Sequence, residues 1–268
     1  MFEKKYGYAN SPLGQLHYAE QGEGPILLLL HQTPRSLDEF RELMPLLADS
    51  FRVIAMDMYG FGASAKFSAP QTIEKFAEGG FALLDALGID NARVLGHHTG
   101  SLVALEMGAA SPERLDAMVL SSMPLTNAEY REAHAEGEGV DIAPTADDGS
   151  HLTHLWALRR PYYPELRPDL LDRFIHDALS FGIDPAEGHL ACARYVMENR
   201  IGRVVAPVLL IGASADPFAF PHLERVAREL VNATTVQTLI IEGGTIPMME
   251  QKAQAIAIGV KSFLGGLK

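Results

Sequence analysis

Cysteine is almost absent from this chain. Cys192 is the only cysteine among 268 residues, so the protein cannot form an internal disulfide. A chain without disulfides must be held together by its packed core, and such chains are typical of reducing compartments. We therefore expect a cytoplasmic protein in which Cys192 is a small, buried apolar side chain.

Long apolar runs and an excess of basic residues are also missing. No apolar run reaches the roughly 18 residues that a membrane span needs, and residues 1–5 lack the apolar core of a signal peptide. Acidic residues outnumber basic ones by 34 to 22, which gives a formal net charge of −12. This charge disfavours nucleic acid and anionic membranes as partners, so we expect a small-molecule substrate. The sequence leaves the oligomeric state open.

The residues that are present predict an α/β fold. With 47% apolar residues, the chain can bury one full core. Residues 5–20 alternate in polarity like an antiparallel hairpin, whereas the buried strands that follow lack this alternation, which is typical of a parallel sheet covered on both faces. The predicted strands are 25–30, 51–56, 92–95, 117–120, 207–211 and 236–241. The predicted helices are 36–47, 72–87, 99–110, 223–230 and 251–263. This order predicts a mostly parallel, doubly wound sheet.

One segment interrupts the alternation of strands and helices. Residues 123–203 are richer in charge, histidine, proline and aromatic side chains than the flanking segments. We predict helices at 170–179 and 189–198 and loops at 129–139 and 143–149. An insertion after the sixth strand of such a sheet lies over the carboxyl ends of the strands, where ligands bind. We therefore interpret 123–203 as a helical cap on a single domain whose core is 1–122 and 204–268.

Five short motifs occur at plausible spacing, and together they resemble the α/β-hydrolase superfamily over essentially the whole chain. They are His31-Gln32, the turn Asp57-Met58-Tyr59-Gly60-Phe61-Gly62-Ala63-Ser64, the frame Gly96-His97-His98-Thr99-Gly100, the turn that ends at Asp216, and Thr245-Ile246-Pro247-Met248-Met249-Glu250. In that superfamily a Gly-x-Ser-x-Gly turn between a strand and a helix exposes the nucleophile. The resemblance implies the α/β-hydrolase fold.

Two positions of the expected catalytic triad depart from that pattern. His98 occupies the position of the nucleophilic serine, and Thr245 occupies that of the catalytic histidine, while the acid, Asp216, is retained. The usual serine mechanism needs both missing residues. We interpret the two departures as one change, in which the His98 ring projects into the space beside Thr245 and is held by Asp216. Such an imidazole can act as a general base, which contributes roughly 10² to 10⁴-fold to rate.

The resemblance also implies an oxyanion hole and a substrate pocket. The backbone N–H groups of Gln32 and Thr99 are the predicted oxyanion donors. The predicted pocket residues are His31, His97, His151, Trp156, Arg159 and Thr245. A Zn or Fe site built on His98, His31 and a cap histidine is conceivable, but neither a His-Glu-x-x-His motif nor a thiolate cluster is present, so we predict no metal and no cofactor.

Three functions fit these residues. A base and an oxyanion hole suffice to hydrolyse an ester, a lactone or an activated C–C bond, and this is the leading interpretation. The same groups could abstract a proton beside a carbonyl in a lyase, isomerase or cyclase. A non-catalytic pseudo-hydrolase that only binds a ligand is the third interpretation. The sequence does not identify the substrate, because the cap residues that face the pocket cannot be recognised from one sequence.

Overall fold

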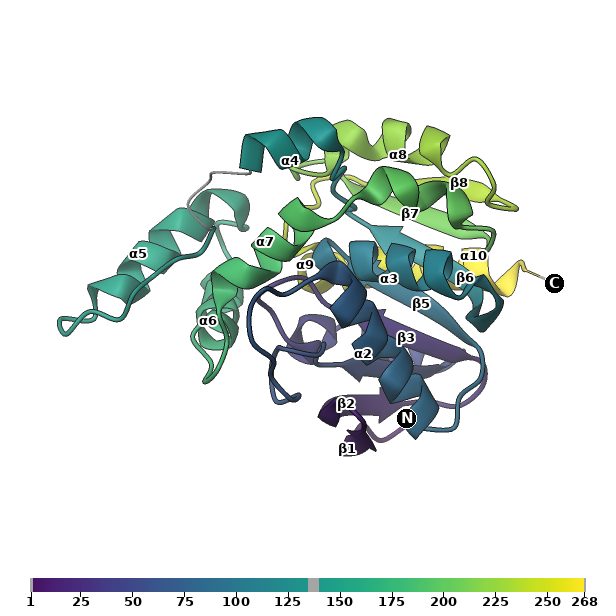
Figure 1. The fold of residues 1–268 in the computed structure, drawn as a ribbon, viewed down its shortest axis with the longest axis horizontal. Coiled ribbons are helices and arrows are strands. Elements are labelled where there is room, and N and C mark those ends of the chain that lie inside the picture. Colours follow the sequence, from purple (N-terminus) through teal and green to yellow (C-terminus); the bar gives the residue numbers. More distant parts are fainter. Residues whose placement is uncertain (1, 135–139, 268) are drawn as a thin grey trace.

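A computed structural model describes residues 2–134 and 140–267, and its centre is one twisted eight-stranded sheet (Figure 1). The order across the sheet is β1-β2-β4-β3-β5-β6-β7-β8. The strands are β1 Lys5–Ser11, β2 Gly14–Gln21, β3 Ile26–Leu30, β4 Arg52–Met56, β5 Ala92–His97, β6 Leu115–Ser121, β7 Val208–Ala213 and β8 Val236–Ile241. The pairs β1–β2 and β2–β4 are antiparallel, and the other pairs are parallel. The predicted hairpin and the mostly parallel sheet are therefore confirmed.

Helices cover both faces of the sheet, as the continuous apolar strands predict. One face packs against α2 (Ile73–Ala86), α3 (Thr99–Ala110) and α8 (Leu223–Glu229) in one large apolar cluster. The other face packs against α1 (Met44–Leu47), α9 (Met248–Gln251) and α10 (Ala253–Gly265) in a second cluster. Among the described residues, no helix is long and apolar enough to cross a membrane.

Two predicted helices are divided in the structure. Residues 36–47 form a short 3₁₀ turn, Leu37–Phe40, and then α1, because Pro45 lacks a backbone N–H and cannot lie inside one continuous helix. Residues 251–263 belong to α9 and α10, which are separated at Lys252. In both cases the helical pattern predicts the location of the helices but not the break between them.

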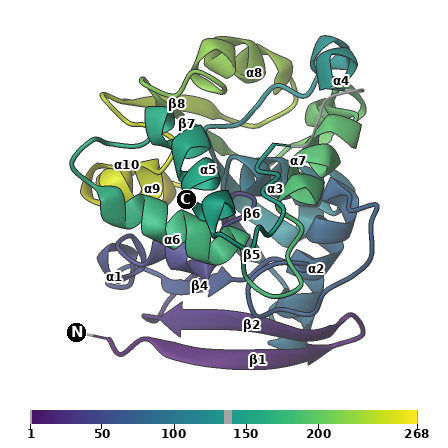
Figure 2. The ribbon, with the colours of Figure 1, turned by 90° about the vertical axis from the view of Figure 1, so that its left-hand side faces the viewer.

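The segment between β6 and β7 contains the helices α4 (Ala128–His134), α5 (Ser150–Arg159), α6 (Pro168–Ala178) and α7 (Pro185–Arg194). Figures 1 and 2 show α5 and α6 at one end of the molecule, beyond the sheet. They share a small apolar cluster that includes Leu155, Leu171 and Phe174. The helical insertion after the sixth strand is thus confirmed, whereas the boundaries 123 and 203 stay a prediction.

The predicted loop at 129–139 is wrong for its first half. Residues up to His134 form α4, and residues 135–139 lie outside the described part of the chain. The Asn127 side chain accepts a hydrogen bond of 2.9 Å from the Tyr130 N–H, which is how asparagine begins a helix. The helix predicted at 189–198 begins earlier, at Pro185, because Asp184 caps the Ala186 N–H.

A buried arginine ties the insertion to the core. Arg35, in the loop after β3, is fully buried, and its Nε donates to Asp177 Oδ2 of α6 at 2.8 Å. Its Nη1 donates to Glu250 Oε1 of α9 at 2.5 Å. One guanidinium therefore joins segments that are 215 residues apart in the sequence, and it holds α6 over the sheet.

Candidate active site

The turn between β5 and α3 presents the side chain of His98. His98 has φ 46° and ψ −115°, a backbone conformation that residues other than glycine rarely adopt. Two glycines make the turn possible, because a Cβ on Gly96 would overlap the Gly100 carbonyl and a Cβ on Gly100 would overlap the Leu30 carbonyl. The Gly-x-x-x-Gly frame is therefore a steric requirement of this strand-to-helix turn.

Replacing Gly100 with alanine is expected to destabilise the protein by at least about 2 kcal/mol, because the obstruction is backbone and cannot rotate away. Urea unfolding of the purified variant measures the change in the free energy of unfolding. Gly265→Ala is the matched control, since nothing lies within 4 Å of the Cβ that it adds to α10. A Gly100→Ala variant as stable as wild type would show that the turn is less tightly packed than described.

Asp216 lies in the turn that follows β7, with 1% of its surface exposed. Its Oδ2 is 3.0 Å from His98 Nε2. The angles at this contact fall short of a well-aligned hydrogen bond, and neither atom has another partner among the described residues. Catalytic hydrogen bonds are often poorly aligned before substrate binds.

The Asp216 carboxylate is held in its ionised form. Burial opposes ionisation, but His98 and the Phe218 N–H, which donates to Oδ1 at 2.9 Å, offset that cost and hold the pKa of Asp216 well below its usual range. A carboxylate beside Nε2 favours the tautomer in which Nε2 carries the proton. Nδ1 of His98 is then the ring nitrogen left to exchange a proton.

His97 lies behind His98 and not in the pocket, contrary to the prediction. It is fully buried, and its Nε2 donates to the Ile246 carbonyl at 2.9 Å. Burial, and then His98 whenever that ring is protonated, lower the pKa of His97 to about 3, so the His97 ring is neutral. The two rings meet edge to face, with their centroids 4.7 Å apart. His97 therefore packs against the His98 ring and supports its position.

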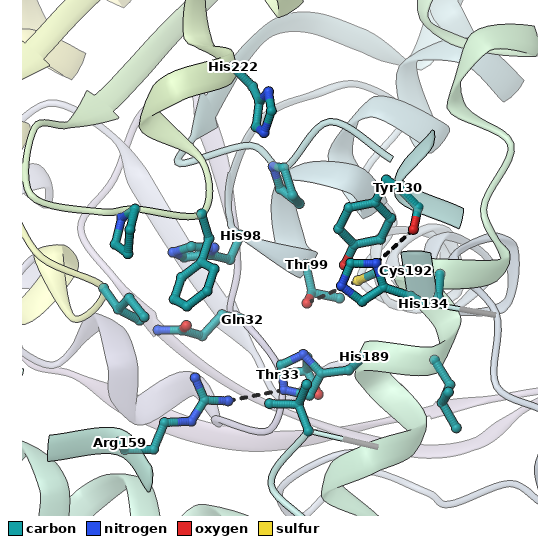
Figure 3. Close-up of a pocket in the computed structure, with 17 residues that line it drawn as sticks. Gln32, Thr33, His98, Thr99, Tyr130, His134, Arg159, His189, Cys192 and His222 are labelled. Atoms are coloured by element: carbon teal, nitrogen blue, oxygen red, sulfur yellow. Dashed lines mark hydrogen bonds between the residues drawn. The ribbon is translucent and has the colours of Figure 1, made fainter. Parts of the chain in front are cut away.

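A cavity of about 370 Å³ opens beside the turn that presents His98, between the carboxyl ends of the strands and the insertion (Figure 3). Four of the predicted residues line it: Gln32, His98, Thr99 and Arg159. The prediction missed other lining residues, among them Thr33, Tyr130, His189 and Phe218. Five predicted pocket residues do not line it: His31, His97, His151, Trp156 and Thr245.

The other misplaced residues have local structural partners. His31 is fully buried, and its Nε2 accepts the Met58 N–H at 2.9 Å. His151 Nδ1 accepts the Ala146 N–H at 3.2 Å, and Trp156 packs against the apolar cluster of the cap. The Thr245 hydroxyl donates to the Gln251 side chain at 2.9 Å. These side chains shape their own loops and helices rather than the cavity.

The predicted oxyanion donor at Gln32 is wrong. Its backbone N–H donates to Glu39 Oε2 at 2.9 Å, and its side-chain amide donates to Oε1 of the same buried carboxyl at 2.5 Å. Thr33 and Thr99 line the cavity, and no described residue accepts a hydrogen bond from either backbone N–H. Thr33 thus replaces Gln32 as the candidate partner of Thr99.

Glu39 is buried among like charges. Burial and the nearby Glu250 carboxyl raise the pKa of Glu39 from 4.5 to about 8, although Arg35 opposes the shift. The folded protein therefore keeps this proton between pH 4.5 and 8, where the unfolded chain releases it. That contribution to stability is complete below pH 4.5 and is lost as the pH rises through 8.

Between pH 5 and 8 the free energy of unfolding of the wild type should fall as the pH rises, in part because of Glu39. Replacing Glu39 with glutamine is expected to make this slope shallower by up to about 1 kcal/mol per pH unit. Glutamine keeps an acceptor for the Gln32 N–H but has no proton to lose. Denaturant titrations across this range measure the slope. Glu78→Gln, at an exposed pair with Lys75, serves as the control that leaves the slope unchanged. Equal slopes for Glu39→Gln and wild type would contradict the assigned shift.

A second ion-paired cluster lies beside the cavity, and sequence reasoning missed it. Asp141 is buried, and it accepts from Arg159 Nε at 2.6 Å, from Arg159 Nη2, and from His189 Nε2 at 2.9 Å. Arg159 Nη2 and His189 Nε2 share the oxygen Oδ2, and these two nitrogens lie 3.2 Å apart (Figure 3). Asp141 and His189 are 48 residues apart, and no local sequence pattern links them.

Among the described residues, no three histidine, cysteine, aspartate or glutamate side chains gather in a way that could hold a metal ion. The predicted absence of a metal and of a cofactor stays a prediction.

Comparison with known proteins finds hydrolases of similar sequence or similar fold. A family model described as "alpha/beta hydrolase fold" matches residues 25–137. Bifunctional epoxide hydrolase 2 of Rattus norvegicus is 36% identical over 127 residues, which cover 45% of this chain but only 22% of that protein. The (E)-2-((N-methylformamido)methylene)succinate hydrolase of Acinetobacter baylyi is 27% identical, and the matched region covers 75% of this chain and 76% of that protein. A solved epoxide hydrolase from an endophytic Streptomyces superposes with a TM-score of 0.81 at 21% identity, over 98% and 96% of the two chains.

Proposed function

We propose that this protein, whose fold is that of the α/β-hydrolases, hydrolyses an ester, a lactone or an activated C–C bond of a small molecule, with His98 as the general base. The observation that carries the proposal is the 3.0 Å separation between Asp216 Oδ2 and Nε2 of His98, a residue that lines the cavity. The hydrolase names of the relatives support the reaction class.

The proposed reaction begins with a water molecule beside His98 Nδ1. The imidazole takes a proton from this water, and the hydroxide oxygen attacks the carbonyl carbon of the substrate. The imidazolium that forms lies next to the ionised Asp216, which stabilises its charge. When the tetrahedral intermediate collapses, the same proton passes to the leaving oxygen or carbon. No step uses a cofactor.

Two backbone donors stabilise the negative oxygen in this proposal. Thr99 is the first residue of α3, so its N–H is one of the helix's unpaired donors. The Thr33 N–H is the second candidate. Preorganised donors of this kind are worth about 3 to 4 kcal/mol each in other hydrolases.

A serine nucleophile is not part of the proposal. Ser101, one turn into α3, is fully buried, and its hydroxyl donates back to the His98 carbonyl. Its oxygen therefore supports the turn from the helix side. We expect fluorophosphonate probes, which label activated serines, to leave Ser101 unmodified.

The proposed function is tested with a panel of p-nitrophenyl esters and aryl lactones, assayed before and after dialysis against EDTA. We expect turnover of some panel members, unchanged by the chelator and without fluorophosphonate labelling. Labelling at Ser101, or activity that returns only on addition of a metal ion, would contradict the mechanism. A stable protein that binds panel members and turns over none of them would be the pseudo-hydrolase instead.

A further inference from the structure

Among the described residues that line the cavity, the ionisable side chains are mostly basic. Its described lining includes four histidines, His98, His134, His189 and His222, together with Arg159, but no carboxylate side chain. The whole chain has an acidic excess, with a formal net charge of −12. A cavity that collects basic groups in an acidic protein favours an anionic ligand over a cationic one.

Arg159 is the fixed positive charge of this cavity. Only 9% of its surface is exposed, and its Nε and Nη2 both donate to Asp141. The guanidinium carbon lies 5.0 Å from the centroid of the Phe174 ring, which covers one face of the group. Asp141 and Phe174 therefore fix the plane of the guanidinium.

One edge of that guanidinium has no partner. Among the described residues, Nη1 of Arg159 makes no hydrogen bond, whereas Nε and Nη2 are occupied on the Asp141 side. Asp141 itself does not line the cavity. A guanidinium presents N–H groups in a planar fork, so the Nη1 edge can still meet a carboxylate.

We propose that the Nη1 edge of Arg159 binds a carboxylate of the substrate, so that the protein acts on small carboxylic acids. The reaction at the other end of the ligand rests on the proposed function, whereas the binding does not. Asp141 positions Arg159, and His189 holds the same Asp141 oxygen, Oδ2, that Arg159 Nη2 contacts. The carboxylate would lie against the cap, with the reacting carbonyl toward His98.

Matched acid–amide pairs test this proposal by calorimetry at neutral pH. The ligands are hexanoate, 4-phenylbutanoate and 3-indolepropionate, each compared with its uncharged primary amide. We expect at least one acid to bind wild type about tenfold or more tightly than its amide, which corresponds to about 1.4 kcal/mol. The same preference is expected in His98→Ala, so loss of hydrolysis and loss of anion binding are separate results.

The decisive variant is the double substitution Arg159→Gln with Asp141→Asn, which leaves the net charge unchanged and buries no lone carboxylate. It should remove the preference for the acid while amide binding stays the same. The control is Arg167→Gln with Asp169→Asn, an exposed pair in the same cap with the same two-point geometry at 2.8 Å and 2.8 Å. Absence of an acid preference in all three wild-type pairs, or its survival in the Arg159/Asp141 variant, would overturn the proposal.

Discussion

Replacing His98 with alanine is expected to lower kcat/KM for an ester of the panel by about 10²- to 10⁴-fold, the range that general base catalysis contributes. Alanine removes the ring that takes the proton from water and leaves the Asp216 carboxylate without its partner. The cavity and the two backbone donors stay in place, so a residual rate above that in water is expected. Steady-state kinetics with wild type and variant at one pH measure the loss.

Two variants show whether such a loss belongs to the His98–Asp216 pair. Asp216→Asn keeps the shape of the acid but not its charge, and it should also lower kcat, because the imidazolium is no longer stabilised. His222→Gln, at another histidine of the cavity lining, should change kcat less than about tenfold. If His98→Ala and His222→Gln had the same small effect, the base would have to be sought elsewhere.

Replacing Arg35 with methionine is expected to destabilise the protein by about 3 to 5 kcal/mol, the usual cost of leaving buried partners of an ion pair uncompensated. Arg35 is fully buried between Asp177 and Glu250, and methionine fills part of its volume without the charge. Because Asp177 belongs to α6, the loss should also loosen the cap. Urea unfolding followed by circular dichroism measures the change.

Arg225→Met provides the comparison for Arg35→Met. Arg225 pairs with Glu229 at 3.0 Å on the surface of α8, where a salt bridge contributes about 0 to 1 kcal/mol. In the triple variant Arg35→Met, Asp177→Asn, Glu250→Gln, stability should partly return, because the unpaired carboxylates are gone. No recovery in the triple variant would mean that Arg35 acts by packing alone.

The fold was predictable because its signals are local. The apolar runs that became β3 and β7 are continuous, since both faces of the sheet are covered. Gly96 and Gly100 are required in the turn before α3 because any larger residue there would overlap the backbone. Helix breaks such as the one at Pro45 and the short helix α4 depend on single residues, and there the predicted boundaries failed.

The candidate site was only partly predictable, because its polar contacts join distant segments. The frame around His98 and the turn of Asp216 could be recognised from the chain, and the structure brings the two side chains to 3.0 Å. The Glu39 carboxyl accepts the hydrogen bond of the Gln32 N–H, and no pattern in the sequence predicts this contact. The cluster of Asp141, Arg159 and His189 depends on how the insertion folds back, and the spacing of apolar residues in the sequence carries no signal for it.

The central claim is that Asp216 holds His98 with its proton on Nε2, which leaves Nδ1 as the base. The most direct test is a ¹⁵N NMR spectrum of the histidine rings, with the His98 signals assigned by their loss in His98→Ala. We predict a protonated Nε2 and an unprotonated Nδ1 at a pH where the enzyme is active, and a disturbed pattern in Asp216→Asn. A proton on Nδ1 with Nε2 bare, or spectra of His98 that Asp216→Asn leaves unchanged, would contradict the account.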